Sequence, residues 1–178
     1  DTYFTTEEKA RMAVVSIYDC LETGKYYGQY AMACFGSDDI FMIKGVGSDG
    51  TRRDISHYKC SASNTWLTTI WQYAYQGIDR ANLAITNIEK MVGYEENEIL
   101  KELVAQAKFL RAFITFDLIK FWGDVPFTTE PTSGYDMTSK PRTDRELIYD
   151  QIINDLDFAK THLKPGNDMA SSEIPCQG

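Results

Sequence analysis

The stretch AKFLRAFITFDLIKFWGDVPF, residues 107–127, decides the fold class of this chain. Its apolar residues recur every three or four positions, which is the spacing of one face of an α-helix. The pattern stops at Gly123 and Pro126, because glycine lets the backbone leave a helix and proline cannot continue one. The stretch therefore predicts the end of a long helix over residues 95–122, with an inner stripe of Leu100, Leu103, Ala107, Leu110, Ile114, Leu118 and Phe121.

The other side chains of this stretch are predicted to specify the fold rather than a binding site. Arg111 lies one position past the inner stripe, where it pairs with a carboxylate or caps a carbonyl group. Asp124 accepts backbone hydrogen bonds at the turn. The aromatic residues are expected to be buried: Phe109, Phe113, Phe116, Phe121 and Trp122.

Helical patterns fill most of the remaining chain. Residues 64–92 carry an apolar seam at alternating spacings of four and three, which ends at Gly93. Only a very short turn separates this helix from the next, so the two must be antiparallel neighbours. The seam consists of Leu67, Trp71, Ala74, Ile78, Ala81, Ile85, Ile88 and Val92.

Two more helices begin at predicted capping boxes, in which a hydroxyl and a carboxylate satisfy free backbone N–H groups. Thr5 with Glu8 starts a helix over residues 6–21, with Met12, Val15 and Tyr18 or Asp19 at helical spacing. Thr143 with Glu146 starts the last helix, whose stripe is Ile148, Ile152, Leu156, Ala159 and Leu163, and Pro165 ends it. Residues 26–35 are compatible with a further short helix.

Residues 36–63 break the helical pattern. Glycine, serine, aspartate and threonine dominate this segment, which predicts a long irregular excursion with short extended pieces at residues 41–43 and 55–59. Long loops without structure of their own are usually functional or disordered. The predicted fold class is therefore mainly α, with antiparallel helix pairs in a tetratricopeptide-like arrangement and a long irregular loop region, although no repeat of about 34 residues is visible.

The composition excludes several function classes. The chain has 178 residues, enough for a single domain, and a net charge of −8, which argues against binding nucleic acid. No run of apolar residues is long enough to cross a membrane. Four scattered cysteines and two histidines argue against a zinc site, so no metal or cofactor is expected. No nucleophile elbow, phosphate loop or histidine metal motif is present, which predicts no catalytic residues and no enzyme.

Four segments carry a family resemblance when taken in order. They are YFTTEEKARMAVVSIYDCL (residues 3–21), WQYAYQGIDRANLAI (71–85), the stretch 107–127, and TDRELIYDQIINDLDFA (143–159). The second resembles a Trp-x3-Tyr-x2-Ile-x3-Asn helix, here Trp71, Tyr75, Ile78 and Asn82, whose spacing predicts structural roles on or beside the seam. The set resembles the N-terminal part of SusD/RagB-type proteins, so residues 1–178 are expected to form a single domain, an N-terminal fragment of a larger SusD-like protein.

The resemblance implies a function that composition does not. Such proteins are surface-exposed lipoproteins of the outer membrane that bind oligosaccharides or other nutrients and deliver them to a TonB-dependent, SusC-type transporter. They are not enzymes. The anchoring cysteine is expected upstream of Asp1, because Cys20 lies inside the first predicted helix.

The candidate ligand-binding residues lie in and just after the irregular excursion. Sugar recognition needs planar hydrogen-bonding groups for hydroxyl pairs and an aromatic face for the apolar side of the ring. These types are supplied by Asp38, Asp39, Arg52, Tyr58, Asn64 and Trp66, in the region where the resemblance implies part of a glycan site. For each residue a solvated loop or a helix cap is the alternative role, and Asn64 in particular fits an N-cap.

Two other functions compete with nutrient binding. The chain can be a helical interaction scaffold that docks on the transporter without direct ligand binding in this fragment. It can also be a glycosidase, but that reaction needs two carboxylates facing each other across a cleft. The adjacent pair Asp38 and Asp39 does not predict such an arrangement, and it does not match a calcium-binding loop either.

Overall fold

A computed structural model of the chain describes residues 3–22, 50–132 and 140–164. In these ranges the chain is mainly helical, as predicted, and its only β pairing is an isolated antiparallel bridge between Val125 and Thr143. The elements are α1 (Glu7–Asp19), α3 (Gly50–Ser56), α4 (Thr65–Ile88), the 3-10 turn η3 (Tyr94–Glu96), α5 (Glu98–Trp122) and α6 (Arg145–His162).

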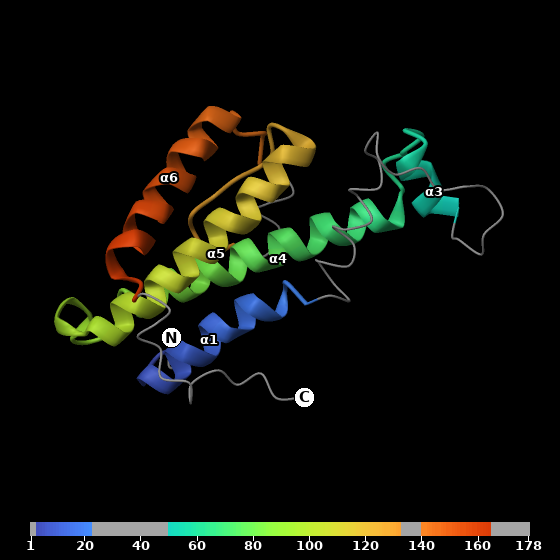
Figure 1. The fold of residues 1–178 in the computed structure, drawn as a ribbon. Coiled ribbons are helices and arrows are strands. Elements are labelled where there is room, and N and C mark those ends of the chain that lie inside the picture. The colour runs from blue at the N-terminus through green and yellow to red at the C-terminus, as the bar shows by residue number, and fades with distance from the viewer. Residues whose placement is uncertain (1–2, 23–49, 133–139, 165–178) are drawn as a thin grey trace.

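The long helices pack as successive antiparallel pairs (Figure 1). α4 runs antiparallel to α5, and α6 returns antiparallel along α5. α1 packs against both α4 and α5. The prediction that the helices around Gly93 are antiparallel neighbours is therefore confirmed, and the arrangement is the tetratricopeptide-like one that the sequence predicts.

One apolar core joins α1, α4, α5 and α6. α4 and α5 approach closely at Gly77, where an added Cβ atom would lie 2.7 Å from Cδ1 of Ile114. A side chain at this position would therefore force the Ile114 side chain to move. The largest fully buried side chains of the core are Val14, Ile17, Ile70, Ile88, Leu100, Leu103, Val104, Ile114, Leu118, Val125 and Ile148.

α5 confirms most of the prediction made from residues 107–127. It begins at Glu98 because the Asn97 side chain accepts hydrogen bonds from the N–H groups of Ile99 and Leu100. It ends at Gly123, which has φ 66° and ψ −125°. Six members of the predicted stripe are buried, from Leu100 to Leu118, whereas Phe121 is exposed.

The prediction that the aromatic residues of this stretch are buried is wrong for three of them. Phe109, Phe116 and Phe121 each expose about two fifths of their surface. Leucine, isoleucine and alanine occupy the inner face of α5, so these phenylalanines lie on its outer side. The ammonium group of Lys120 lies 5.1 Å from the centroid of the Phe116 ring and covers part of it.

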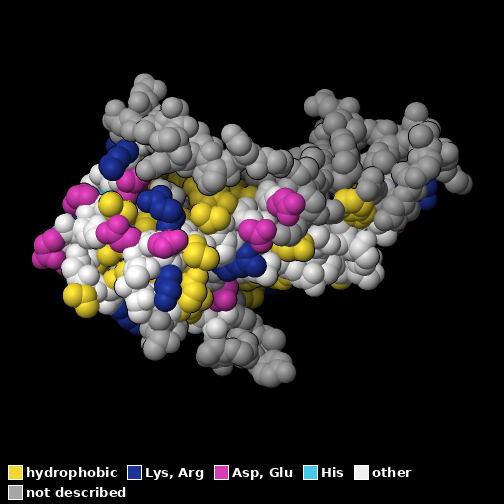
Figure 2. All heavy atoms as spheres, turned by 90° about the horizontal axis from the view of Figure 1, so that it is seen from below, with side chains coloured by type: hydrophobic (Ala, Val, Ile, Leu, Met, Phe, Trp, Pro, Cys, Tyr) yellow, Lys and Arg dark blue, Asp and Glu magenta, His cyan; other side chains and the backbone are white. Residues whose placement is uncertain are grey.

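The prediction for α1 is wrong about both its cap and its face. Thr6 rather than Thr5 is the N-cap, and its hydroxyl oxygen accepts the N–H of Lys9. The buried face consists of Ala10, Val14 and Ile17, whereas Met12, Val15 and Tyr18 are exposed. Figure 2, which views the molecule from the α1 side, shows hydrophobic side chains exposed among interspersed acidic and basic ones.

α6 shows the same one-residue displacement of its cap. Asp144, not Thr143, accepts the N–H of Glu146. On the inner face Ile148, Ile152 and Ala159 are buried as predicted, but Leu156 is exposed and the neighbouring Asp155 is buried instead. Asp155 is buried because it forms an ion pair with Arg111 in the core.

Two further boundaries differ from the prediction. α4 ends at Ile88, so Val92 falls in the turn that follows and is fully exposed. Residues 50–56 form the helix α3 within the predicted irregular segment, and therefore residues 55–59 are not an extended piece. Residues 26–35, residues 41–43 and Pro165 lie outside the described ranges.

Candidate functional site

The predicted ligand-binding region is built around the start of α4. Asn64 is buried, and its side-chain oxygen accepts the N–H groups of Trp66 and Leu67 at 3.1 and 3.3 Å. Its amide nitrogen donates to the carbonyl oxygen of Thr51, 2.8 Å away. Asn64 therefore caps α4 and fastens α3 to it, which is the alternative role considered for this residue.

Two predicted aromatic residues flank Asn64 in the sequence. Tyr58 follows α3 in the left-handed backbone region, with φ 56°, and its side chain is exposed. Trp66 lies in the first turn of α4 and is half-buried. α3 and the first turn of α4 form one end of the molecule (Figure 1), so the structure brings these two aromatic groups to the same end.

The other three predicted residues remain predictions. Asp38 and Asp39 lie outside the described ranges. Arg52 lies within α3, but its side chain is not among those described.

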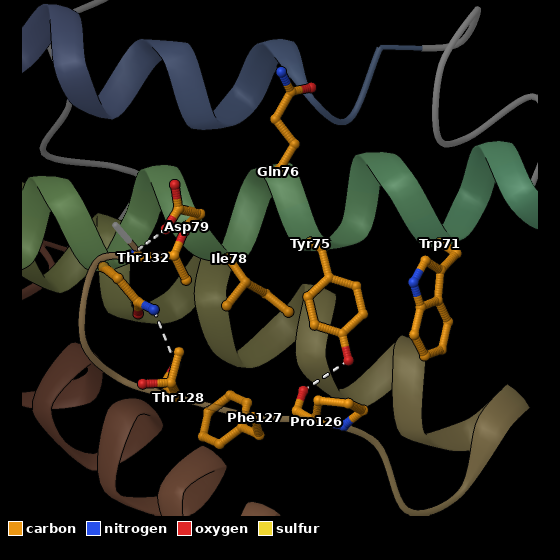
Figure 3. A pocket seen from close by; sticks show the side chains of 10 residues that line it. Trp71, Tyr75, Gln76, Ile78, Asp79, Pro126, Phe127, Thr128 and Thr132 are labelled. Atoms are coloured by element: carbon orange, nitrogen blue, oxygen red, sulfur yellow. Dashed lines mark hydrogen bonds between the residues drawn. The ribbon is translucent and has the colours of Figure 1, made fainter. Parts of the chain in front are cut away.

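A groove beside α4 was not predicted. It has a volume of about 450 Å³ and lies between α4 and the segment 126–132, which we call the strap (Figure 3). The sequence placed four of the groove's α4 residues on or beside the helix seam, namely Trp71, Tyr75, Ile78 and Asn82, and gave no role to Gln76 and Asp79. The strap is almost 50 residues away in sequence, so no local signal linked the two. The groove is lined by Trp71, Tyr75, Gln76, Ile78, Asp79, Asn82, Pro126, Phe127, Thr128 and Thr132.

Hydrogen bonds from α4 hold the strap in place. The Tyr75 hydroxyl donates to the carbonyl oxygen of Pro126 at 2.7 Å (Figure 3). The Asn82 amide donates to two strap carbonyls, those of Thr128 at 2.9 Å and Glu130 at 3.1 Å. Burial raises the pKa of Tyr75, so the hydroxyl keeps the proton that it donates. Tyr75 and Asn82 therefore have the structural roles that their spacing predicts.

Asp79 completes the attachment at the far end of the strap. Its Oδ1 atom accepts hydrogen bonds from both the N–H and the hydroxyl group of Thr132, at 2.8 and 2.6 Å (Figure 3). A carboxylate that receives two hydrogen bonds from one residue fixes the direction of the backbone there.

A buried ion pair supports the same region from behind. Nε and Nη2 of Arg111 donate to the two carboxylate oxygens of Asp155 at 2.8 and 2.7 Å, and Nη1 donates to Oδ1 of Asn82 at 2.8 Å. Both charged side chains are almost fully buried. The prediction that Arg111 pairs with a carboxylate is confirmed, and the pair links α6 through α5 to the strap.

Asp124 also acts as predicted, but across a longer distance in sequence. Its Oδ1 accepts the backbone N–H of Arg145 at 3.3 Å, the first residue of α6. The turn after α5 is thereby attached to the start of the next helix.

The groove has an aromatic wall and several polar lining groups. Trp71 packs against Tyr75 and Trp122, with ring centroids 4.8 and 5.3 Å apart, and gives the groove an aromatic wall. Gln76 and Asp79 add polar groups along α4 (Figure 3). In the part of the chain that the structure describes, no three His, Cys, Asp or Glu side chains are close enough to hold a metal ion. No described helix is long and apolar enough to span a membrane.

Comparisons with known proteins point to one family. A SusD-like family model, described as "Starch-binding associating with outer membrane", matches residues 4–169. SusD-like protein P25 of Formosa agariphila is 30% identical over 175 residues, which cover 92% of this chain and 32% of that protein. The chain thus spans about a third of the length of the curated relatives it matches.

Solved structures share the fold. A SusD-like carbohydrate-binding protein of Bacteroides fragilis superposes with a TM-score of 0.81 at 21% identity, over 98% of this chain and 35% of that one. A laminarin-binding SusD-like protein superposes with a TM-score of 0.76 at 23% identity, over 93% of this chain and 37% of that one. Since the family model covers nearly the whole chain, the chain belongs to the SusD-like (SusD/RagB) family of carbohydrate-binding proteins that associate with the outer membrane.

Proposed function

We propose that this chain is part of a cell-surface protein that binds oligosaccharides and passes them to a TonB-dependent, SusC-type transporter. The observation that carries the proposal is the presence of two aromatic side chains at the α3 end, Tyr58 just after α3 and Trp66 in the first turn of α4, in a chain of a carbohydrate-binding family. Aromatic rings present an apolar face to the C–H groups of a sugar while the tyrosine hydroxyl bonds its hydroxyl groups. The protein acts by binding, without catalysis.

The site is proposed to extend beyond these two side chains. Arg52, which lies in α3, and the carboxylates of Asp38 and Asp39 would supply the planar groups for paired sugar hydroxyls. Asn64 contributes indirectly, because its hydrogen bonds to Thr51 and Trp66 hold α3 against α4. The membrane attachment is proposed to be a lipid anchor at the outer membrane, on the outer surface of the cell.

Calorimetry with a panel of oligosaccharides tests the binding proposal. Neutral glucans derived from laminarin are the first ligands to try, because a structural neighbour is described as laminarin-binding. We expect Trp66→Ala and Tyr58→Ala each to weaken binding about tenfold, equivalent to about 1.4 kcal/mol. Phe109→Ala is the matched control, since Phe109 is an exposed aromatic residue of α5 far from α3 in the sequence.

Two results would count against the proposal. One is the absence of binding to every glycan in the panel. The other is unchanged affinity in both variants of the α3 end, since glycan contact at Tyr58 and Trp66 would then be absent.

The scaffold function is a second candidate, favoured by the exposed apolar face of α1. Met12, Val15 and Tyr18 lie three residues apart and are each about half exposed. A face of this kind suits contact with another protein. Met12→Glu combined with Val15→Glu should abolish co-purification with a SusC-type transporter under this function and leave glycan affinity unchanged. Retained co-purification would remove the support that α1 gives to it.

A further inference from the structure

A second hollow lies at the end of the bundle opposite α3. It forms where α4 passes through η3 into α5 and where α6 ends, and Figure 1 shows this end far from α3. Its volume is about 380 Å³. The function proposed above makes no use of it. The lining side chains are Glu89, Tyr94, Glu95, Lys101, Phe158 and His162.

The aromatic wall of this hollow is held in place by its neighbours. Phe158 and His162 lie one helical turn apart on α6, with ring centroids 4.4 Å apart. The ammonium group of Lys108 lies over the Phe158 ring, 4.1 Å from its centroid, and also pairs with Glu89 at 3.3 Å. Rings fixed in this way lose little conformational freedom when a ligand packs against them.

Several polar groups of the hollow are not used by the protein. Within the described ranges, the Tyr94 hydroxyl, the Glu95 carboxylate and the imidazole nitrogens of His162 make no hydrogen bond to another protein group. Burial, together with the charges of Glu89 and Glu95, raises the pKa of Tyr94 to about 12. The hydroxyl therefore stays protonated and can both donate and accept a hydrogen bond.

These groups match the chemistry of a sugar ring. A pyranose has an apolar face of C–H groups, which suits aromatic side chains, and hydroxyl groups that both donate and accept hydrogen bonds. Carboxylate, phenol, imidazole and ammonium groups around one aromatic wall meet both requirements. A metal ion suits the hollow less well, because no described group of three His, Cys, Asp or Glu side chains converges there.

The local charges select the kind of sugar. Lys108 pairs with Glu89, and Lys101 pairs with Glu98 at 3.5 Å. Glu95 has no ion-pair partner among the described residues, so its carboxylate is the acidic group of the hollow that no ion pair engages. A uronic acid carboxylate would be repelled there, whereas a neutral sugar would not.

We propose that this hollow is a second saccharide-binding site, selective for neutral over uronic acid sugars and remote from the α3 end. The proposal rests on the proposed function, because it assumes that glycans are the ligands of this chain. It adds a place of contact on the end formed by η3 and α6.

Nuclear magnetic resonance titration of the 178-residue chain tests the proposal. The probe is a neutral glucose trisaccharide from laminarin, followed in a parallel titration by a trisaccharide of uronic acids. We expect the neutral sugar to shift the resonances of Tyr94, Glu95, Phe158 and His162, with a dissociation constant separate from that of the α3 end. The uronic acid sugar should leave them unchanged.

Conservative variants keep the test independent of folding. Tyr94→Phe with Glu95→Gln preserves the shape of the turn and should weaken binding at the hollow about tenfold. Glu96→Gln is the matched control, because Glu96 lies in the same turn η3 but does not line the hollow.

The possible outcomes separate this proposal from the function on which it rests. Shifts confined to the α3 end would overturn the second site and leave the proposed function intact. The same shifts at the hollow with the uronic acid sugar would overturn its selectivity. No shifts anywhere, with either sugar, would overturn both proposals.

Discussion

Arg111 joins three parts of the molecule around the strap. It reaches α6 through Asp155, α4 through Asn82 and the strap through the carbonyl of Thr129. Asp155 also accepts a hydrogen bond from Gln151 at 3.0 Å. A buried pair with this many partners does more to fix geometry than to add net stability.

We expect Arg111→Leu to lower the free energy of unfolding by about 3–5 kcal/mol, because it leaves the carboxylate of Asp155 buried without a counter-charge. The double variant Arg111→Leu with Asp155→Leu should recover part of this loss, since no charge is then left in the core. Urea unfolding measures both values.

The exposed pair of Arg145 and Asp124 is the control. Its atoms are 3.8 Å apart and both side chains are at least half exposed. Arg145→Leu should therefore cost no more than about 1 kcal/mol. Equal losses for Arg111→Leu and Arg145→Leu would contradict the importance given to burial.

Tyr75 predicts a pH dependence. Burial raises its pKa in the folded chain, so the folded state keeps a proton that the unfolded chain loses near pH 10. The stability that the protonated Tyr75 hydroxyl contributes should therefore be fully present below about pH 10 and be lost as the pH rises above it. Tyr75→Phe should lose about 1 kcal/mol at neutral pH with the hydrogen bond to Pro126, and should show a shallower fall above about pH 10. Parallel slopes for the two proteins, measured by urea unfolding at several pH values, would rule this out.

At the residue scale, sequence reasoning identified the kind of cap but not its position. Thr5 and Thr6, like Thr143 and Asp144, are consecutive residues that can both cap a helix. The choice depends on how the following helix face meets the core, which no local pattern contains. Arg111 could be predicted to seek a carboxylate, but its partner is 44 residues away.

At the scale of elements, the end of α5 depends on the backbone of one glycine. Gly123 and Gly93 both have positive φ, and an added Cβ atom would meet nothing within 4 Å at either position. They differ in ψ, which is −125° at Gly123 and 12° at Gly93. Only Gly93 is in the left-handed helical region, which asparagine tolerates.

We expect Gly123→Ala to destabilise the chain by about 1–3 kcal/mol through backbone strain. Gly93→Asn should change the free energy of unfolding by less than about 1 kcal/mol. Thermal unfolding of the two variants compares them directly, and similar melting temperatures for both would show that the backbone at Gly123 is not as constrained as its angles indicate.

The long helices could be predicted from periodicity, whereas the face of a short one could not. α4 and α5 repeat their apolar spacing over six turns or more, so a single stripe stands out. α1 has only 13 residues, with apolar side chains at Met12, Val14, Val15 and Ile17 that fit more than one stripe. Contact with α4 and α5 decides which of them is buried.

At the scale of the whole molecule, one core argues for one folding unit. Val14 and Ile17 of α1 belong to the same buried cluster as the apolar faces of α4, α5 and α6. We expect unfolding in a single cooperative transition, with circular dichroism and tryptophan fluorescence giving the same midpoint. Earlier loss of hydrogen-exchange protection in α1 than in α5 would show that the chain is not one cooperative unit.

Only part of the candidate site could be predicted, because helix packing brings together residues that are far apart in the sequence. Tyr58, Asn64 and Trp66 lie close together in sequence, so a local composition signal could indicate them, even though Asn64 acts as a cap. The groove is formed by α4 and a strap that follows α5, and the hollow by Tyr94 and Phe158, which are far apart in the chain. Hollows that helix packing assembles cannot be found before the helices are placed in space.

The length of α4 has a consequence for the size of ligand. A helix of 24 residues, at about 1.5 Å per residue, is about 36 Å long. The length of α4 therefore sets the distance between the α3 end and the hollow beside η3. If a single glycan spans that distance, its second contact becomes intramolecular, and its avidity exceeds the affinity of either contact alone. Apparent affinity should then rise abruptly once a saccharide chain is long enough to reach both ends.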